Sequence, residues 1–181
     1  MKRFHIPAFT LLATTAILVV FHASGGNGTA FSSSDTDLQH RLVGSWKAVS
    51  FADVPDHGET VYPFGKSPSG LMIYTANGYF SISVMAGPNS IVPKDISAMS
   101  VEDWRGLAQQ FLSWFGTYRT SDSQTIVLHV NGSSWPAYNG TDQVRKCRVE
   151  GDNLVFYGDY TKNDHYYHYE HVFRRLNEQP R

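Results

Sequence analysis

From residue 45 onward, hydrophobic and polar residues alternate in short runs separated by Gly, Pro, Asn and Asp, a pattern typical of β-strands. Asn77-Gly78 lies between two of these runs and is a strong hairpin signal. We predict eight main strands in sequential antiparallel order, over residues 45–51, 71–75, 79–85, 116–120, 124–130, 143–149, 154–160 and 166–174. A brief edge segment at 60–62, ended by Pro63, is expected beside them.

One segment has a helical period instead. Ser100 and Asp103 have the spacing of a capping box at the start of a helix. Apolar residues then recur at three- and four-residue steps: Val101, Trp104, Ala108, Phe111 and Phe115. The pattern predicts one helix, inserted between the third and fourth strands.

Eight sequential antiparallel strands suit an all-β up-and-down barrel, because closure removes the exposed edges of a flat sheet. A barrel of this size has room for one small ligand. A two-sheet sandwich has the same strand count and stays an alternative. We expect the barrel domain to cover residues 38–176, after a flexible leader at 26–37 and before a polar tail at 177–181.

The N-terminus has the layout of a secretory signal peptide. Lys2 and Arg3 precede an apolar stretch from Ala8 to Phe21, and small residues follow at 23–26. Because this stretch is shorter than the ~20 residues of a spanning helix, we favour cleavage over a retained anchor. We predict a signal peptide at residues 1–25, no membrane span after cleavage, and a secreted or secretory-lumen protein.

Three Asn-Gly-Ser/Thr sequons agree with export. They begin at Asn27, Asn131 and Asn139, which we predict to be glycosylated. The same tripeptides also occur in ordinary polar turns, so the sequons alone leave both explanations open.

Composition excludes several kinds of chemistry. Of 181 residues, 15 are Lys or Arg and 16 are Asp or Glu, so a polyanion such as nucleic acid is not an expected partner. The only cysteine, Cys147, rules out a Cys-based zinc site, an iron–sulfur cluster and an internal disulfide, and we expect it to be a core residue. His168 and His171 alternate to opposite faces of a strand, so no metal site is predicted. Nucleophile-elbow, dinucleotide and phosphate-loop motifs are absent, and no cofactor is predicted.

Gly44-Ser45-Trp46 near the start of the barrel, with Arg174-Arg175 near its end, resembles the Gly-x-Trp and terminal Arg pairing of lipocalins. The segments at 42–51, 62–65, 70–75 and 77–79 are similar to those of the lipocalin-like domain family of bacteria and fungi, and the likeness covers residues 40–175. The resemblance implies that Trp46 closes one end of the barrel and that Arg174 or Arg175 stacks against it. We assign the structural pair as Trp46 and Arg174.

Alternation indicates which side chains line the barrel. On the last strand, Tyr167, Tyr169 and His171 share a face, which we expect to line the interior, while His168 and Glu170 meet solvent. Arg145 shares the face of Cys147, so it points inward toward an anion, a carbonyl-rich ligand or an acidic partner, or else sits solvated at the rim. His129 fits either face. Our candidate catalytic residues are Arg145 and His129, and our candidate ligand-binding residues are Tyr74, Trp104, Tyr118, Tyr167, Tyr169 and His171.

The family resemblance also implies a function. Lipocalin-like proteins of fungi include helpers of natural-product biosynthesis, some of which direct cyclisations, isomerisations, and Diels–Alder or hetero-Diels–Alder reactions. Our first hypothesis is therefore a cofactor-free cyclase or isomerase that binds an apolar small molecule. A carrier or scavenger of such a molecule explains the same residues. A filled barrel that serves only as a structural or interaction domain is the third class. No oligomeric state is predicted.

Overall fold

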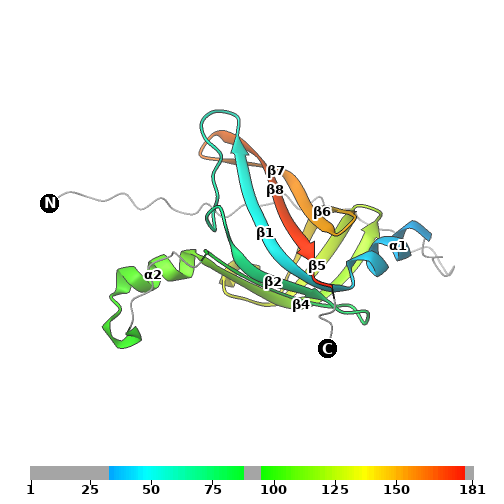
Figure 1. Cartoon of the computed structure of the whole chain (residues 1–181), viewed down its shortest axis with the longest axis horizontal. Coiled ribbons are helices and arrows are strands. Elements are labelled where there is room, and N and C mark those ends of the chain that lie inside the picture. Colours follow the sequence, from blue (N-terminus) through cyan, green and yellow to red (C-terminus); the bar gives the residue numbers. More distant parts are fainter. Residues whose placement is uncertain (1–32, 88–94, 178–181) are drawn as a thin grey trace, which may run out of the picture. The chain divides into compact units, whose positions relative to one another are not determined.

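The computed structural model describes residues 33–87 and 95–177, and its eight strands form a closed barrel. Each strand pairs antiparallel with the next, and β8 pairs with β1, so that β1 lies between β2 and β8 (Figure 1). The strands are β1 Gly44–Pro55, β2 Ser69–Tyr74, β3 Tyr79–Met85, β4 Phe111–Asp122, β5 Thr125–Ser133, β6 Thr141–Glu150, β7 Asn153–Lys162 and β8 His165–Arg175. The up-and-down barrel is confirmed, and the sandwich alternative is excluded.

In the described part of the chain, one helix precedes β1 and the other helical segments lie in connections between strands. The α-helices are α1 Ser33–Leu42 and α2 Val101–Gln109, and the short 3-10 helices are η1 Ile96–Ala98 and η2 Pro136–Tyr138. Helix α2 lies between β3 and β4 as predicted, and Ser100 and Asp103 form its capping box. Among the described helices, none is both long enough and apolar enough to span a membrane.

The predicted helix was too long at its C-terminal end. Phe111 and Phe115 belong to β4, where Phe115 pairs with Ser81 of β3 and is exposed on the outer face. Its ring packs over Gly132, a position without a side chain on β5. Residues four apart share a face in both a helix and a strand, so the spacing of these two phenylalanines did not distinguish the two structures. The expected edge segment at 60–62 is reduced to one bridge between Val61 and Asp53.

Helix α1 was not predicted, because we treated residues up to 37 as a leader. Its apolar anchors Leu38 and Leu42 lie one turn apart, and both are buried in the barrel core. The rest of the helix sequence is polar. Two apolar positions are too few to produce a helical period, and tertiary packing stabilises this helix instead.

Trp46 closes the end of the barrel beside α1. The side chain is fully buried, and its Nε1–H donates to the carbonyl of Leu42 at 2.8 Å. The guanidinium of Arg175 lies 4.1 Å from the ring centroid and donates to the carbonyl of Val43 at 2.8 Å. Trp46 pairs directly with Arg175 across β1 and β8, whereas Arg174 pairs with Lys47 and is exposed. The assignment of Arg174 as the partner of Trp46 was therefore wrong by one residue.

The interior next to this closed end is apolar. Its most deeply buried side chains include Tyr74, Ile126, Cys147, Leu154 and Phe173. Burial, with a smaller contribution from the charge of Asp122, raises the pKa of Cys147 to about 12. The thiol therefore stays protonated at neutral pH, and the prediction that Cys147 is a core residue is confirmed.

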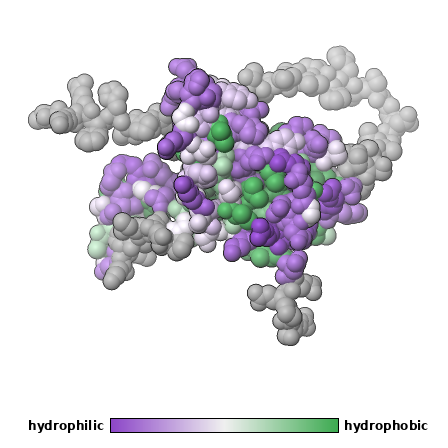
Figure 2. All heavy atoms as spheres, turned by 45° about the horizontal axis from the view of Figure 1, so that its top comes forward, coloured by the Kyte–Doolittle hydropathy of each residue, from purple (hydrophilic) through white to green (hydrophobic). Residues whose placement is uncertain are grey.

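Hydrophilic side chains cover much of the face displayed in Figure 2, with hydrophobic side chains gathered in places between them. Helix α2 contributes two of the exposed large hydrophobic residues, Val101 and Trp104. The buried apolar side chains form a cluster inside the barrel, and this cluster includes the two leucines of α1.

We predict that Trp46→Ala lowers the free energy of unfolding by about 3–5 kcal/mol, because it removes a fully buried ring and the surface on which Arg175 stacks. Chemical denaturation measures this loss. The matched control is Trp104→Ala, which truncates a tryptophan that is 46% exposed and should change the unfolding midpoint little. A Trp46→Ala protein that unfolds at the wild-type midpoint but no longer binds small molecules would show that Trp46 belongs to the ligand site.

Candidate functional site

Away from the closed end, the inner face of the barrel becomes polar. We call these inward-facing side chains the inner polar band: Asp53, Gln143, Arg145, Tyr160, Tyr167, Tyr169 and His171. Strand alternation sets their direction, since Phe173, Phe156 and Cys147 on the same strands are core residues. All members except Asp53 are partly exposed. The inward-facing groups therefore keep contact with solvent at this end of the barrel.

Asp53 enters the band through a β-bulge. The register between β1 and β8 shifts between Ala48 and Ser50. Trp46 and Ala48 face inward before the shift, and Phe51 and Asp53 face inward after it. An unbroken strand would have turned Asp53 toward solvent. The extra residue re-aims the carboxylate, as bulges near functional sites commonly do.

The carboxylate of Asp53 joins two aromatic side chains. The hydroxyl of Tyr160 donates to Oδ2 of Asp53 at 3.0 Å, and Nε2 of His171 lies 3.4 Å from Oδ1. The imidazole packs between Phe51 and Tyr169, at centroid distances of 4.4 and 4.9 Å. Burial and the negative charge of Asp53 raise the pKa of Tyr160, so its hydroxyl remains a donor.

Tyr169 occupies a space left by a glycine. It pairs with Gly158 across β7 and β8, and a Cβ atom at Gly158 would lie 2.9 Å from the hydroxyl oxygen of Tyr169. Any larger residue there would displace the phenol. Burial raises the pKa of Tyr169, while the positive charge of Arg145 acts in the opposite direction. The phenol of Tyr169 therefore lies within electrostatic reach of the guanidinium.

Arg145 lies on the inner face of β6 and is partly exposed, so it shares features of both sequence interpretations, an Arg that points inward and an Arg solvated at the rim. Its guanidinium donates to Oε1 of Gln143 and to the carbonyl of Val144, each at 2.9 Å, and lies 5.8 Å from the ring centroid of Trp114. Within residues 33–87 and 95–177, no carboxylate forms an ion pair with it. The band thus holds a positive charge whose partners here are neutral oxygens.

Two buried polar atoms in the described part of the barrel lack a hydrogen-bond partner, the hydroxyl of Tyr74 and Nε1 of Trp114. Tyr74 packs edge-on against Tyr118 at 4.7 Å, and the hydroxyl of Tyr118 donates to the carbonyl of Thr75. Burial raises the pKa of Tyr74 well above its usual value, so the orphan hydroxyl is a donor. An unsatisfied buried donor costs about 1–3 kcal/mol, which a ligand oxygen or a water molecule would relieve.

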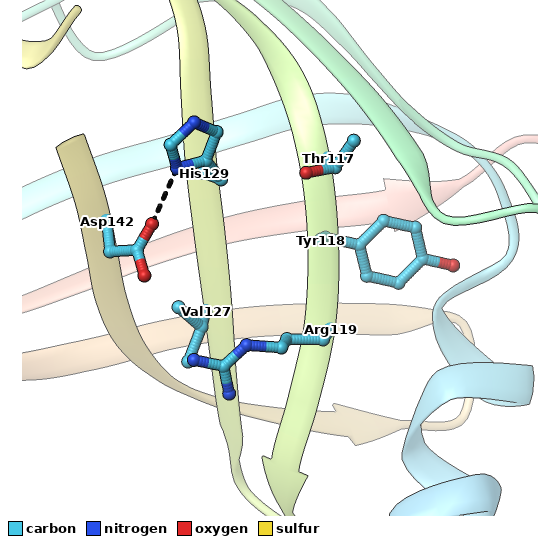
Figure 3. Close-up of a pocket in the computed structure, with 6 residues that line it drawn as sticks. All are labelled: Thr117, Tyr118, Arg119, Val127, His129 and Asp142. Atoms are coloured by element: carbon cyan, nitrogen blue, oxygen red, sulfur yellow. Dashed lines mark hydrogen bonds and ion pairs between the residues drawn. The ribbon is translucent and has the colours of Figure 1, made fainter. Parts of the chain in front are cut away.

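His129 lies apart from this set. It is exposed on the outer face of β5, where Nδ1 lies 2.7 Å from Oδ1 of Asp142 (Figure 3). A pocket of about 90 Å³ surrounds the pair, lined also by Thr117, Tyr118, Arg119 and Val127. That volume is close to three water molecules and is well below the 300–1,000 Å³ typical of ligand sites. The structure does not bring His129 and Arg145 together, because they face opposite sides of the barrel wall.

The other predicted ligand-binding residues divide between the barrel and α2. Tyr167, Tyr169 and His171 belong to the inner polar band. The rings of Tyr167 and Tyr160 are stacked, with their centroids 5.0 Å apart and an interplanar angle of 6°. Tyr74 and Tyr118 lie deeper in the core. Trp104 is exposed on α2, a helix without a buried side chain. The inner polar band therefore draws on β1, β6, β7 and β8.

Several site residues were missed from the sequence. Asp53 was hidden by the bulge, which reverses the alternation established by Trp46 and Ala48. Tyr160 could have been found, because it shares the alternation of Phe156 on β7. Gly158 also carried a signal, since a glycine inside a strand often marks a close approach of another group.

Comparison with curated proteins finds no match. Comparison with protein families finds one that is described as a lipocalin-like domain and that matches residues 43–166, more than half of the chain. The match runs from the start of β1 into β8 and includes the bulge and most of the inner polar band. The chain belongs to the lipocalin-like domain family.

Proposed function

We propose that the protein binds a hydrophobic small molecule at the inner polar band and acts on it as a cofactor-free cyclase or isomerase in natural-product biosynthesis. A lipocalin-like barrel suits the binding of a small hydrophobic ligand. The finer proposal concerns what happens to that ligand once it is bound.

The inward guanidinium of Arg145 is the observation that carries this proposal. A partly desolvated Arg that has only neutral partners is costly, and it interacts best with a carbonyl or anionic oxygen. A ligand with such an oxygen beside an apolar body would match both the charge of the band and the apolar core below it. The unpartnered N–H of Trp114, whose ring centroid lies 5.8 Å from the guanidinium of Arg145, favours a further oxygen atom on the same ligand.

A site of this kind can accelerate a cyclisation without a nucleophile. The aromatic rings of Tyr167, Tyr169 and His171 would hold one conformer of the substrate, and effective molarity rises when reacting atoms are held close together. A hydrogen bond from Arg145 to a substrate carbonyl would withdraw electron density and favour attack on one face. Cys147 takes no part, because its thiol is buried and protonated.

We further propose that the protein works in the secretory pathway. The predicted signal peptide and Asn27 lie outside the described residues. Asn131 and Asn139 are exposed, Asn131 near the end of β5 and Asn139 directly after η2. Exposure is what an oligosaccharide transferase requires of an acceptor asparagine.

We predict that Arg145→Leu lowers kcat/KM by about 5- to 150-fold, equivalent to about 1–3 kcal/mol, because it removes a charged hydrogen-bond donor from the transition state. Product analysis with polyene or quinone-methide substrates measures both the rate and the stereochemical excess. Arg148→Leu is the matched control, since Arg148 lies on the outer side of the same strand with Glu150 and Glu170. If the wild-type protein gives the product ratio found in buffer alone, the protein is a carrier or scavenger.

We also predict that the secreted protein lacks residues 1 to about 25 and carries glycans at Asn131 and Asn139. Intact-mass analysis before and after enzymatic deglycosylation measures both features, and Asn131→Gln and Asn139→Gln assign the sites. A mature protein that begins at Met1 without glycans would contradict the secretory proposal.

A further inference from the structure

We propose that His171, held in position by Asp53, is a general base that removes a proton from the carbon next to a ligand carbonyl. The ligand class is an enolisable carbonyl compound whose oxygen binds Arg145. This inference rests on the proposed function and deepens it, because it assigns the site a chemical step in addition to shape and charge.

The first argument is the orientation of the imidazole. Nε2 of His171 faces the Asp53 carboxylate, and in the neutral imidazole this contact favours the tautomer with the proton on Nε2 and the lone pair on Nδ1. Among the described residues, no hydrogen-bond partner of Nδ1 is found. The side chain of His171 is 28% exposed, against 10% for Asp53. The basic nitrogen is thus available to a ligand while its carboxylate partner is shielded.

The second argument is a contrast with the other His–Asp pairs of the protein. His129–Asp142 and His168–Asp159 have short separations of 2.7 and 2.8 Å, but both lie on the outer face with about half of each side chain exposed. His165–Asp56, at 3.5 Å, lies at the start of β8, and its imidazole is 54% exposed. His171–Asp53 is the pair that faces the interior, and the hydroxyl of Tyr160 holds its carboxylate by a second hydrogen bond. A distance of 3.4 Å is long for a hydrogen bond, and such bonds often tighten only when substrate is present.

The third argument is the row of residues that connects the base to Arg145. Tyr169 pairs with Asp53 on one side and with Gly158 on the other. The printed pairing of β6 with β7 ends at Lys146 and Tyr157, so Arg145 and Gly158 are the next residues on the two strands. The missing side chain at Gly158 leaves room for the Tyr169 phenol. Burial raises the pKa of this phenol, the charge of Arg145 lowers it, and the charges of Asp159 and Asp53 raise it. A ligand lying on Tyr169 would have Asp53 on the neighbouring β1, Arg145 toward β6, and His171 two residues further along β8.

This arrangement supports a balanced proton transfer. Nδ1 of His171 takes the α proton, the C–H electron pair moves toward the carbonyl, and the negative charge develops on the oxygen beside Arg145. The carboxylate of Asp53 stabilises the imidazolium without accepting its proton, as an aspartate does for a catalytic histidine. If the enolate is conjugated, its γ carbon takes the proton back from His171. Otherwise its carbon attacks a second carbonyl carbon in the same molecule, the π pair of that carbonyl moves to its oxygen, and this oxygen takes the proton from His171. The first outcome is an isomerisation and the second is a ring closure, and neither needs an oxidant or a reductant.

The test uses 5-nitrobenzisoxazole, a probe that needs only a positioned base. The base removes the C3 proton, the N–O bond breaks, and 2-cyano-4-nitrophenolate is released as a coloured product. We expect the full-length protein to accelerate this elimination above buffer. His171→Gln should lose at least tenfold in kcat/KM, and Asp53→Asn should lower kcat with little change in KM, because Asp53 positions the base without touching the probe.

The matched control is His168→Gln. It removes a histidine that also contacts an aspartate, Asp159, but that lies on the outer face of the same strand. We expect it to keep the wild-type rate. His171→Phe, which retains ring packing against Phe51 and Tyr169, replaces His171→Gln if the latter unfolds. Retention of the wild-type rate by either folded His171 variant would overturn the assignment of the base.

A parallel titration with 1-anilinonaphthalene-8-sulfonate separates this inference from the proposed function. In one outcome, the dye binds the wild-type protein and 5-nitrobenzisoxazole displaces it, but the elimination rate does not depend on His171. The assignment of His171 as the base is then wrong, while the proposal of binding in the barrel stands. If the dye binds neither the wild-type protein nor the variants, and no elimination exceeds that of buffer, the binding proposal fails and the base assignment fails with it.

Discussion

The pairing of β1 with β8 closes the barrel, and most of the features described above depend on it. At one end it places Trp46 opposite Arg175, so that the indole is buried and the cation covers it. In the middle its bulge reverses the alternation of β1. At the other end it sets Asp53 opposite Tyr169, inside the barrel. One antiparallel ladder therefore stabilises the closed end and builds the polar end.

The interior is divided along the strand direction between these two environments. Apolar side chains fill the part beneath α1, where their burial stabilises the fold. Beyond them, Arg145 has neutral partners and Asp53 is shared between Tyr160 and His171. Charged groups in partly buried surroundings lower the stability of the fold, because they lose hydration. They also interact strongly with a ligand, because these surroundings screen charge less than water does. This division fits a hydrophobic ligand with a polar, oxygen-bearing end.

Much of this arrangement could be predicted from alternation alone, and the errors have identifiable physical causes. The limits of β3 and the shared face of Tyr167, Tyr169 and His171 follow from a two-residue period that no irregularity interrupts. Asp53 was not predicted to face inward, because the bulge reverses the alternation of β1. The position of the bulge is set by the pairing of β1 with β8 and is not visible in the sequence of β1 alone. Arg174 and Arg175 are adjacent, so composition cannot separate them, and only the register with Trp46 does. Helix α1 is stabilised by its contacts with the barrel, which local sequence does not encode.

The central claim is that the ligand binds inside the open end of the barrel and not in the outer pocket beside His129. The most direct measurement follows the indole N–H signal of Trp114 in ¹⁵N-labelled protein by NMR during titration with 1-anilinonaphthalene-8-sulfonate. That N–H lacks a hydrogen-bond partner among the described residues, whereas the N–H of Trp46 donates to Leu42. We expect the Trp114 signal to shift in a saturable manner while the Trp46 signal stays in place. Shifts confined to His129, Asp142 and their neighbours, with Trp114 unchanged, would contradict the claim.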